Sequence, residues 1–166
     1  MTSILLGNIF SVLATGADVF GSSRKSTKAM LTAQTVGQFF LAASAFVLGG
    51  YSAVVQNIVS IVRNLTALKD KSGKALEYTL VVLGVVLGIV FNNLGLIGWL
   101  PILSNLEYSL SVFRFKNNER MLKAAFALCI VLYAVFNVAI SNYVGAVSNT
   151  VVLATTLISL RKCCAK

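Results

Sequence analysis

Long apolar stretches alternate with short polar ones along the whole chain. Seven apolar segments stand out, at about residues 3–20, 29–48, 51–68, 78–91, 95–113, 121–140 and 143–160. A helix that crosses a membrane needs roughly 17–25 mainly apolar residues. The fourth segment, "TLVVLGVVLGIVFN", reaches that length only with Glu77 and its neighbours at the membrane interface. The pattern predicts an all-α membrane protein with seven transmembrane helices.

Composition supports the same class of protein. Hydrophobic residues make up 57% of the 166 residues and charged residues only 11%, whereas a soluble domain carries about 25% charged residues. The chain has no histidine, which excludes histidine-based catalysis, proton relays and metal sites. We find no phosphate-binding loop, no metal-ligand spacing and no nucleophile paired with a base. The sequence therefore predicts neither an enzyme nor a cofactor.

The basic residues lie in four clusters that follow every second span. The turns after the second, fourth and sixth spans carry none of the fourteen lysines and arginines. Seven spans place all fourteen on one side, which the positive-inside rule makes the cytoplasmic side. We therefore expect an outside N-terminus, a cytoplasmic C-terminus and no nucleic-acid binding despite the net charge of +9. The clusters are Arg24, Lys25 and Lys28; Arg63, Lys69, Lys71 and Lys74; Arg114, Lys116, Arg120 and Lys123; and Arg161, Lys162 and Lys166.

One polar segment occurs twice. The stretch "GGYSAVVQNIVSIVRNLTALKD", residues 49–70, matches "SNYVGAVSNTVVLATTLISLRK", residues 141–162, at a spacing of 92, so that Asn57 corresponds to Asn149. Spans one to three and five to seven can be superposed in this way. Because three spans are an odd number, two repeats of the same orientation need a linking span between them. The sequence predicts a 3+1+3 plan of parallel repeats, with residues 1–70 as the first repeat, 71–93 as the linker helix and 94–166 as the second repeat with a short tail.

Three stretches carry a resemblance to a known family: "LLGNIFSVLATGADVF", "FVLGGYSAVVQNIVSIVRNLTALKDKS" and "LGLIGWLPILSN". On these, the chain resembles the YgjV family of bacterial inner-membrane proteins over nearly its whole length. Its plan is similar to that of the SWEET and PQ-loop superfamily of small transporters. The resemblance implies a location in the bacterial cytoplasmic (inner) membrane. In SWEET-type carriers an asparagine in the third span of each half faces the central pocket, and Asn57 and Asn149 match that arrangement. The chain departs from SWEETs in having a single proline, Pro101, and no PQ dipeptide.

Polar residues inside the spans are the candidate substrate-binding groups. Asn57 and Asn149 each follow a small residue one helical turn earlier, an arrangement that suits either a pocket or a hydrogen bond between tightly packed helices. The first span carries a polar stripe at helical spacing, and such a stripe faces protein or water rather than lipid. The candidates are Asn57, Asn149, Ser60 and Arg63, together with Asn8, Ser11 and Thr15 of the stripe.

Two carboxylates lie within spans and are the candidates for proton or cation coupling. Glu107 lies about 10 Å from the cytoplasmic charges at 1.5 Å per residue, where a charge is costly unless it is paired or hydrated. A static ion pair with Arg63 or Arg114, or a position at the interface, is the alternative for Glu107. Asp18 ends the first-span stripe, and the alternative there is an interfacial partner for a basic residue of the following loop. Arg63 attracts an anionic group or offsets a carboxylate, or else marks the interfacial end of its span.

These observations favour a small-solute transporter or facilitator with its site between the two repeats. Few formal charges line the spans, so a neutral or singly charged solute is favoured. A non-transporting receptor or assembly partner on the same fold is the alternative, with the asparagines holding helices together. The expected partners are the lipid bilayer and an unidentified small molecule, with a homo-oligomer left open. The adjacent Cys163 and Cys164 are either a lipid-anchor site or a chance pair of small residues.

Overall fold

The computed structural model describes residues 2–69, 73–115, 117–140 and 142–164, and it gives no side-chain placement for residues 2, 163 and 164. The predicted roles of Lys71, Lys116 and Lys166, and of the Cys163 and Cys164 side chains, lie outside that description. The described residues form seven α-helices, as the sequence predicts. They are α1 (Thr2–Ser22), α2 (Thr27–Val47), α3 (Tyr51–Leu68), α4 (Lys74–Val90), α5 (Trp99–Phe115), α6 (Glu119–Ala139) and α7 (Tyr143–Cys164).

Two helix starts differ from the predicted spans by four residues. Helix α4 begins at Lys74, four residues before the apolar run, because the polar first turn continues the helix beyond the apolar segment. Helix α5 begins at Trp99, four residues later than predicted. Gly95 has φ +58°, and this left-handed conformation, which glycine adopts without strain, belongs to the turn between α4 and α5.

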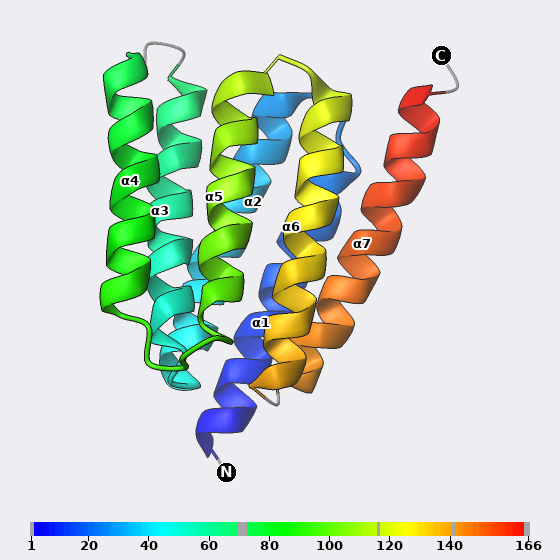
Figure 1. The fold of residues 1–166 in the computed structure, drawn as a ribbon. Coiled ribbons are helices and arrows are strands. Elements are labelled where there is room, and N and C mark those ends of the chain that lie inside the picture. The colour runs from blue at the N-terminus through cyan, green and yellow to red at the C-terminus, as the bar shows by residue number, and fades with distance from the viewer. Residues whose placement is uncertain (1, 70–72, 116, 141, 165–166) are drawn as a thin grey trace.

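The helices run side by side along one axis, with consecutive helices antiparallel (Figure 1). Six of them form a closed ring, since α1 packs on α2, α2 on α3, α3 on α5, α5 on α6, α6 on α7, and α7 on α1. Helix α4 packs on both α3 and α5, and it lies at the edge of the bundle (Figure 1). The first and last helices of the chain are therefore neighbours.

The C-terminal ends of all the odd-numbered helices lie at one end of the bundle (Figure 1). We call this the basic end, because the basic clusters of the sequence lie at or near these helix ends. The N-terminus and the turns after α2, α4 and α6 lie at the opposite end (Figure 1). Arg63 and Lys123 depart from the pattern, because their side chains are buried within the bundle.

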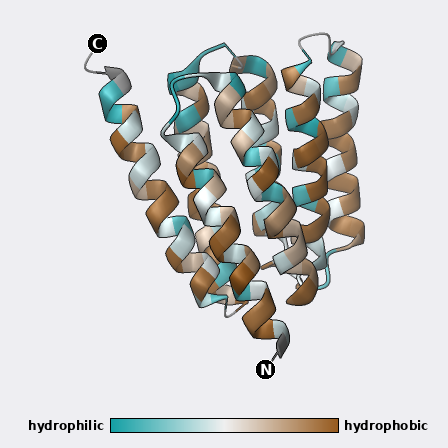
Figure 2. Ribbon diagram, turned by 180° about the vertical axis from the view of Figure 1, so that it is seen from behind, coloured by the Kyte–Doolittle hydropathy of each residue, from teal (hydrophilic) through white to brown (hydrophobic). Residues whose placement is uncertain are grey.

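The outer faces of the helices are apolar, and much of the polar material is inside. Large exposed side chains such as Phe39, Phe46, Val90 and Val147 are 64–70% exposed, and apolar residues, drawn in brown, occur along every helix (Figure 2). Among the described residues, α1, α2, α6 and α7 are long and apolar enough to cross a membrane, by length and composition. Helices α4 and α5 have only 17 residues each, and α3 carries many buried polar side chains. This is the architecture of an integral membrane protein.

Two apolar clusters pack at different heights in the bundle. The larger one includes Met30, Leu31 and Leu122, which lie near the basic end of α2 and α6. The smaller one joins Ala53 to Phe136, near the opposite end. Space between these clusters is enclosed by the ring.

Packing of α4 depends on glycine. A Cβ at Gly88 would clash with the Gln56 amide and would lie 2.7 Å from Ile102 Cγ1. We expect Gly88→Ala to lower the free energy of unfolding by about 1–3 kcal/mol, because the well-packed neighbours must shift. Gly16→Ala is the matched control, since no atom lies within 4 Å of a Cβ there. Thermal unfolding in detergent should separate the two variants, and equal shifts would contradict this account of the α4 contact.

Candidate functional site

A cavity lies inside the ring, between α1, α2, α3, α6 and α7. The space in it that the centres of water molecules can occupy is about 50 Å³. Its apolar wall comes chiefly from α6, through side chains such as Phe126, Ile130 and Phe136. The polar lining is dominated by carboxamides and is contributed by Asp18, Gln38, Ser44, Asn57, Tyr133, Asn137, Asn142 and Asn149.

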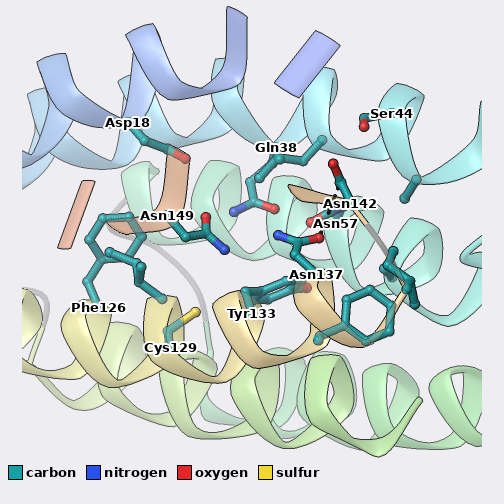
Figure 3. Close-up of a pocket in the computed structure, with 16 residues that line it drawn as sticks. Asp18, Gln38, Ser44, Asn57, Phe126, Cys129, Tyr133, Asn137, Asn142 and Asn149 are labelled. Carbon is teal, nitrogen blue, oxygen red and sulfur yellow. Dashed lines mark hydrogen bonds between the residues drawn. The ribbon is translucent and has the colours of Figure 1, made fainter. Parts of the chain in front are cut away.

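The residues that line the cavity are spread along the bundle axis. Its α6 wall extends from Phe126 to Ile140, which corresponds to about 21 Å at 1.5 Å per residue. Asp18 lies at one end, on the last full turn of α1 before the basic end. Figure 3 shows the amide groups of Gln38, Asn57, Asn137 and Asn149 gathered beyond Asp18, with Asn142 farther along.

The two asparagines singled out by the repeat both line this cavity. Asn57 is only 2% exposed, and Asn149 is half-buried. Asn57 Oδ1 and Asn149 Nδ2 are buried without a hydrogen-bond partner. Hydrogen bonds from these atoms to neighbouring helices, which the packing alternative requires, are therefore not formed among the described residues.

Asp18 also points into the cavity (Figure 3). Its side chain is 8% exposed, and its Oδ1 atom has no hydrogen-bond partner. The Arg24 guanidinium instead packs over the Phe20 ring, 3.7 Å from its centroid. The interpretation of Asp18 as an interfacial ion-pair partner is therefore wrong, because its carboxylate is buried away from the basic loop.

Gly37 provides the room that the Asp18 carboxylate occupies. A Cβ at Gly37 would lie 2.6 Å from Asp18 Oδ1, so any larger residue on that face of α2 would displace the carboxylate. Helices α1 and α2 also approach closely at Gly21, where a Cβ would lie 2.9 Å from the Ala33 Cβ. Small residues on both helices thus fix where Asp18 lies.

The rest of the first-span stripe does not reach the cavity. Ser11 Oγ donates to the Gly7 carbonyl at 3.1 Å and lies 3.0 Å from Ser44 Oγ. Thr15 donates to the Ser11 carbonyl at 2.7 Å. Asn8 is half-buried and is not among the lining residues. The predicted continuous polar face is thus divided, because Ser11 bonds to α2 and Thr15 bonds to its own helix.

Ser60 and Arg63 belong to a second buried polar cluster, between α3 and α5, which we call the Asn105 cluster. Asn105 Oδ1 accepts from Ser60 Oγ at 2.8 Å, from Arg63 Nη1 at 2.8 Å and from Ser109 Oγ at 3.3 Å. Asn105 Nδ2 donates to Gln56 Oε1 at 2.6 Å. The cluster consists of Gln56, Ser60, Arg63, Asn64, Asn105 and Ser109. Neither Ser60 nor Arg63 lines the cavity.

Arg63 is buried, and no carboxylate of the described residues forms an ion pair with it. Its side chain is 1% exposed, so the interpretation as an interfacial arginine is wrong. Besides Asn105, the guanidinium donates to Ser109 Oγ at 3.2 Å and to Asn64 Oδ1 from both Nε and Nη2, at 3.0 and 2.9 Å. It also lies 4.7 Å from the centroid of the Tyr108 ring. Neutral oxygens and an aromatic face therefore surround this charge.

Glu107 does not line the cavity. Its Oε1 accepts from Ser111 Oγ at 3.2 Å, and its Oε2 is buried without a hydrogen-bond partner. Within the described part of the chain, neither Arg63 nor Arg114 forms an ion pair with it. The static ion-pair interpretation is therefore wrong for the described residues.

Sequence reasoning missed several of the residues that matter most here. Gln38, Asn137 and Asn142 line the cavity, and Asn105 connects the second cluster. Gln34 Oε1 accepts from the Tyr108 hydroxyl at 2.8 Å. A signal was present, because each of these amides lies in or beside an apolar span, where polar side chains face protein or water.

No group of three or more histidine, cysteine, aspartate or glutamate side chains is placed to hold a metal ion within the described residues. Cys129 is buried and free, and Ser104 Oγ lies 3.0 Å from both its carbonyl oxygen and its Sγ. The cavity presents one carboxylate and several amides that can form hydrogen bonds. This lining suits the binding of a polar molecule.

Comparison with known proteins gives one match. A family model described as Imp-YgjV, bacterial inner membrane protein, matches residues 5–166. No curated protein and no solved structure is significantly similar to this chain.

Proposed function

The chain belongs to the Imp-YgjV family of bacterial inner membrane proteins, and on that premise we propose that it moves a small solute across the membrane through the central cavity. The observation that carries the proposal is a set of four buried, unpaired polar atoms lining one cavity. They are Asp18 Oδ1, Gln38 Oε1, Asn57 Oδ1 and Asn149 Nδ2.

Unpaired buried polar atoms are costly. Each one costs about 1–3 kcal/mol relative to a satisfied group, and buried polar atoms in folded proteins are nearly always paired with protein or water. Four such atoms in one cavity are well explained by a polar occupant that restores their hydrogen bonds. Unpaired buried atoms also occur outside the cavity, at Gln34 Nε2, Ser52 Oγ, Asn64 Nδ2 and Glu107 Oε2. The four named above differ from these in belonging to residues that line one cavity.

The packing of the helices supports two repeats around this site. When α1, α2 and α3 are exchanged with α5, α6 and α7, the contacts α1–α2, α2–α3 and α1–α7 become α5–α6, α6–α7 and α3–α5, all of which occur. Asn57 and Asn149 correspond under this exchange. We therefore retain the 3+1+3 plan, with α4 as the linker, and place the solute site between the halves. Relative movement of the halves would expose the site alternately to either side.

The proposal places the basic end in the cytoplasm, following the positive-inside rule. In a background lacking the three native cysteines, we expect a membrane-impermeant maleimide to label Asn93→Cys, at the opposite end, in right-side-out membrane vesicles. Ser23→Cys, at the basic end, should react only after the vesicles are opened. The measurement is the labelled fraction of each variant, and the reverse pattern would overturn this orientation.

Uptake into proteoliposomes tests the transport itself. Purified protein is reconstituted and exposed to an equimolar panel of amines, amino acids, polyols and organic acids, and the vesicle contents are measured by mass spectrometry. We expect at least one solute to enter faster than into protein-free vesicles. Ala53→Phe should abolish this uptake, because Ala53 lines the cavity and is 3% exposed.

Val62→Phe is the matched control for Ala53→Phe. Val62 lies on the same helix but is 42% exposed on its outer face, so a phenyl group there leaves the cavity open. Uptake that is unchanged in Ala53→Phe would show that the solute does not pass through the cavity. The absence of any uptake from the whole panel would favour a receptor or assembly role for the same fold.

A further inference from the structure

The charged groups that line the cavity are of one sign, negative. Asp18 supplies the only carboxylate among its lining residues, and no lysine or arginine lines it. Within the described part of the chain, no basic side chain forms an ion pair with Asp18. A buried carboxylate without a cation is strongly unfavourable, and inside a membrane such groups mark substrate or ion pathways.

The packing of α1 against α2 also fixes the position of the Asp18 carboxylate. Asp18 is 8% exposed, and Gly37 leaves the space in which its Oδ1 lies. The Asp18 side chain enters the cavity from α1 (Figure 3). The carboxylate is thus held within the bundle at one end of the cavity, where a cation could reach it.

The amides of the cavity can bind neutral polar groups. Gln38 Oε1 and Asn57 Oδ1 are buried acceptors and Asn149 Nδ2 is a buried donor, and none of the three has a hydrogen-bond partner among the described residues. Each carboxamide carries both an acceptor oxygen and two donor hydrogens. A ligand with neutral groups that donate and accept hydrogen bonds would satisfy them.

The shape of the cavity argues against a bare metal ion as the sole occupant. Its α6 wall is about 21 Å long at 1.5 Å per residue, from Phe126 to Ile140. Asp18 lies at one end and the amides lie farther along (Figure 3). A single ion at Asp18 would leave those amides without partners, whereas an elongated molecule would contact both.

From these observations we infer that the solute is a small, elongated molecule with a protonated amino group at one end, which Asp18 binds, and neutral hydrogen-bonding groups that the amides bind. The inference rests on the proposed function and narrows it to a class of substrate. The neutral part of the molecule lies beside Gln38, Asn57 and Asn149. Neither a polyanion nor a wholly apolar molecule fits this lining.

Three probes of equal chain length test the inference: 5-aminopentanamide, which is a cation, 5-hydroxypentanamide, which is neutral, and glutaramate, which is an anion. Their affinities for the full-length protein in nanodiscs are measured by ligand-induced thermal shift. We expect the cation to bind about tenfold more tightly than the neutral probe, because a hydrogen bond to a charged group is worth about 1.5–3 kcal/mol. Glutaramate should bind most weakly.

Asp18→Asn should remove the preference, bringing the cation and the neutral probe to within about twofold of each other. Glu107→Gln is the matched control, since it removes the same charge from a carboxylate outside the cavity, and the preference should persist. If Asp18→Asn does not fold, the comparison of the three probes on the unaltered protein decides alone. A neutral or anionic probe that binds as tightly as the cation would overturn the inference.

The proteoliposome uptake experiment separates this inference from the proposed function. If a solute from the broad panel enters vesicles in a manner blocked by Ala53→Phe, but carries no positive charge and is indifferent to Asp18→Asn, the inference fails and the transport proposal stands. If no solute of any class enters, both fail together.

Discussion

Replacing Asn105 by leucine is expected to lower the free energy of unfolding by about 3–5 kcal/mol, the range seen when one partner of a buried charged network is removed. Asn105 Oδ1 accepts hydrogen bonds from Ser60, Arg63 and Ser109, and its amide nitrogen donates to Gln56. Leucine has a similar volume but cannot make any of these bonds. Arg63 would then remain buried with only Asn64 and Ser109 as acceptors for its guanidinium.

Thermal unfolding of the purified protein in detergent measures this effect, and Asn105→Asp distinguishes charge from volume. Aspartate retains an acceptor for Arg63 and adds a negative charge beside a guanidinium with which no carboxylate of the described residues forms an ion pair. We expect Asn105→Asp to recover much of the stability lost in Asn105→Leu, although the bond to Gln56 is lost. Equal losses in the two variants would show that Arg63 does not depend on Asn105.

Replacing Asn57 by leucine is expected to impair solute uptake without lowering stability. Asn57→Leu should lower solute uptake by at least about tenfold, equivalent to 1.4 kcal/mol, while leaving thermal stability unchanged or slightly raised. Asn57 is as deeply buried as Asn105, at 2% against 4% exposed, but its Oδ1 has no hydrogen-bond partner. Replacing an unsatisfied polar group by an apolar one of the same shape is nearly neutral or stabilising.

Asn149→Leu should behave like Asn57→Leu, because it lines the same cavity from the other half of the ring. The measurements are initial uptake rates in proteoliposomes and melting temperatures of the same preparations. A loss of stability in Asn57→Leu comparable to that in Asn105→Leu would mean that this asparagine holds helices together. Unchanged uptake in both cavity variants would mean that these amides do not contact the solute.

The seven helices could be predicted from the sequence because each contains an apolar run that is separated from the next by charged residues, glycine or other polar residues. The placement of Asn57 and Asn149 in one cavity could also be predicted from the sequence, because residues at equivalent positions of two repeats are expected to face the same site. Ser11 and Thr15 were misplaced because helical spacing defines a face but not the helix that packs against it. The partner of Ser11 is Ser44, 33 residues away.

The environment of Arg63 could not be predicted for a related reason. Its partners on α5 lie 42 and 46 residues away in the chain, and no local pattern links them. The seventh helix had no counterpart to Arg63, because Thr155 occupies the corresponding position. An arginine near the end of a span resembles an interfacial residue until the polar side chains of the facing helix are known.

The contact between α1 and α7 has a consequence for how the protein is made. Ribosomes release α1 first and α7 last, so the ring cannot close until the whole chain has been synthesised and inserted. Until then Asp18, on α1, belongs to a cavity that lacks its α7 wall. A carboxylate facing hydrocarbon is costly, so the nascent bundle must keep this side wet or shielded within the insertion machinery. Insertion of α7 thus completes the cavity and encloses the Asp18 carboxylate within the bundle.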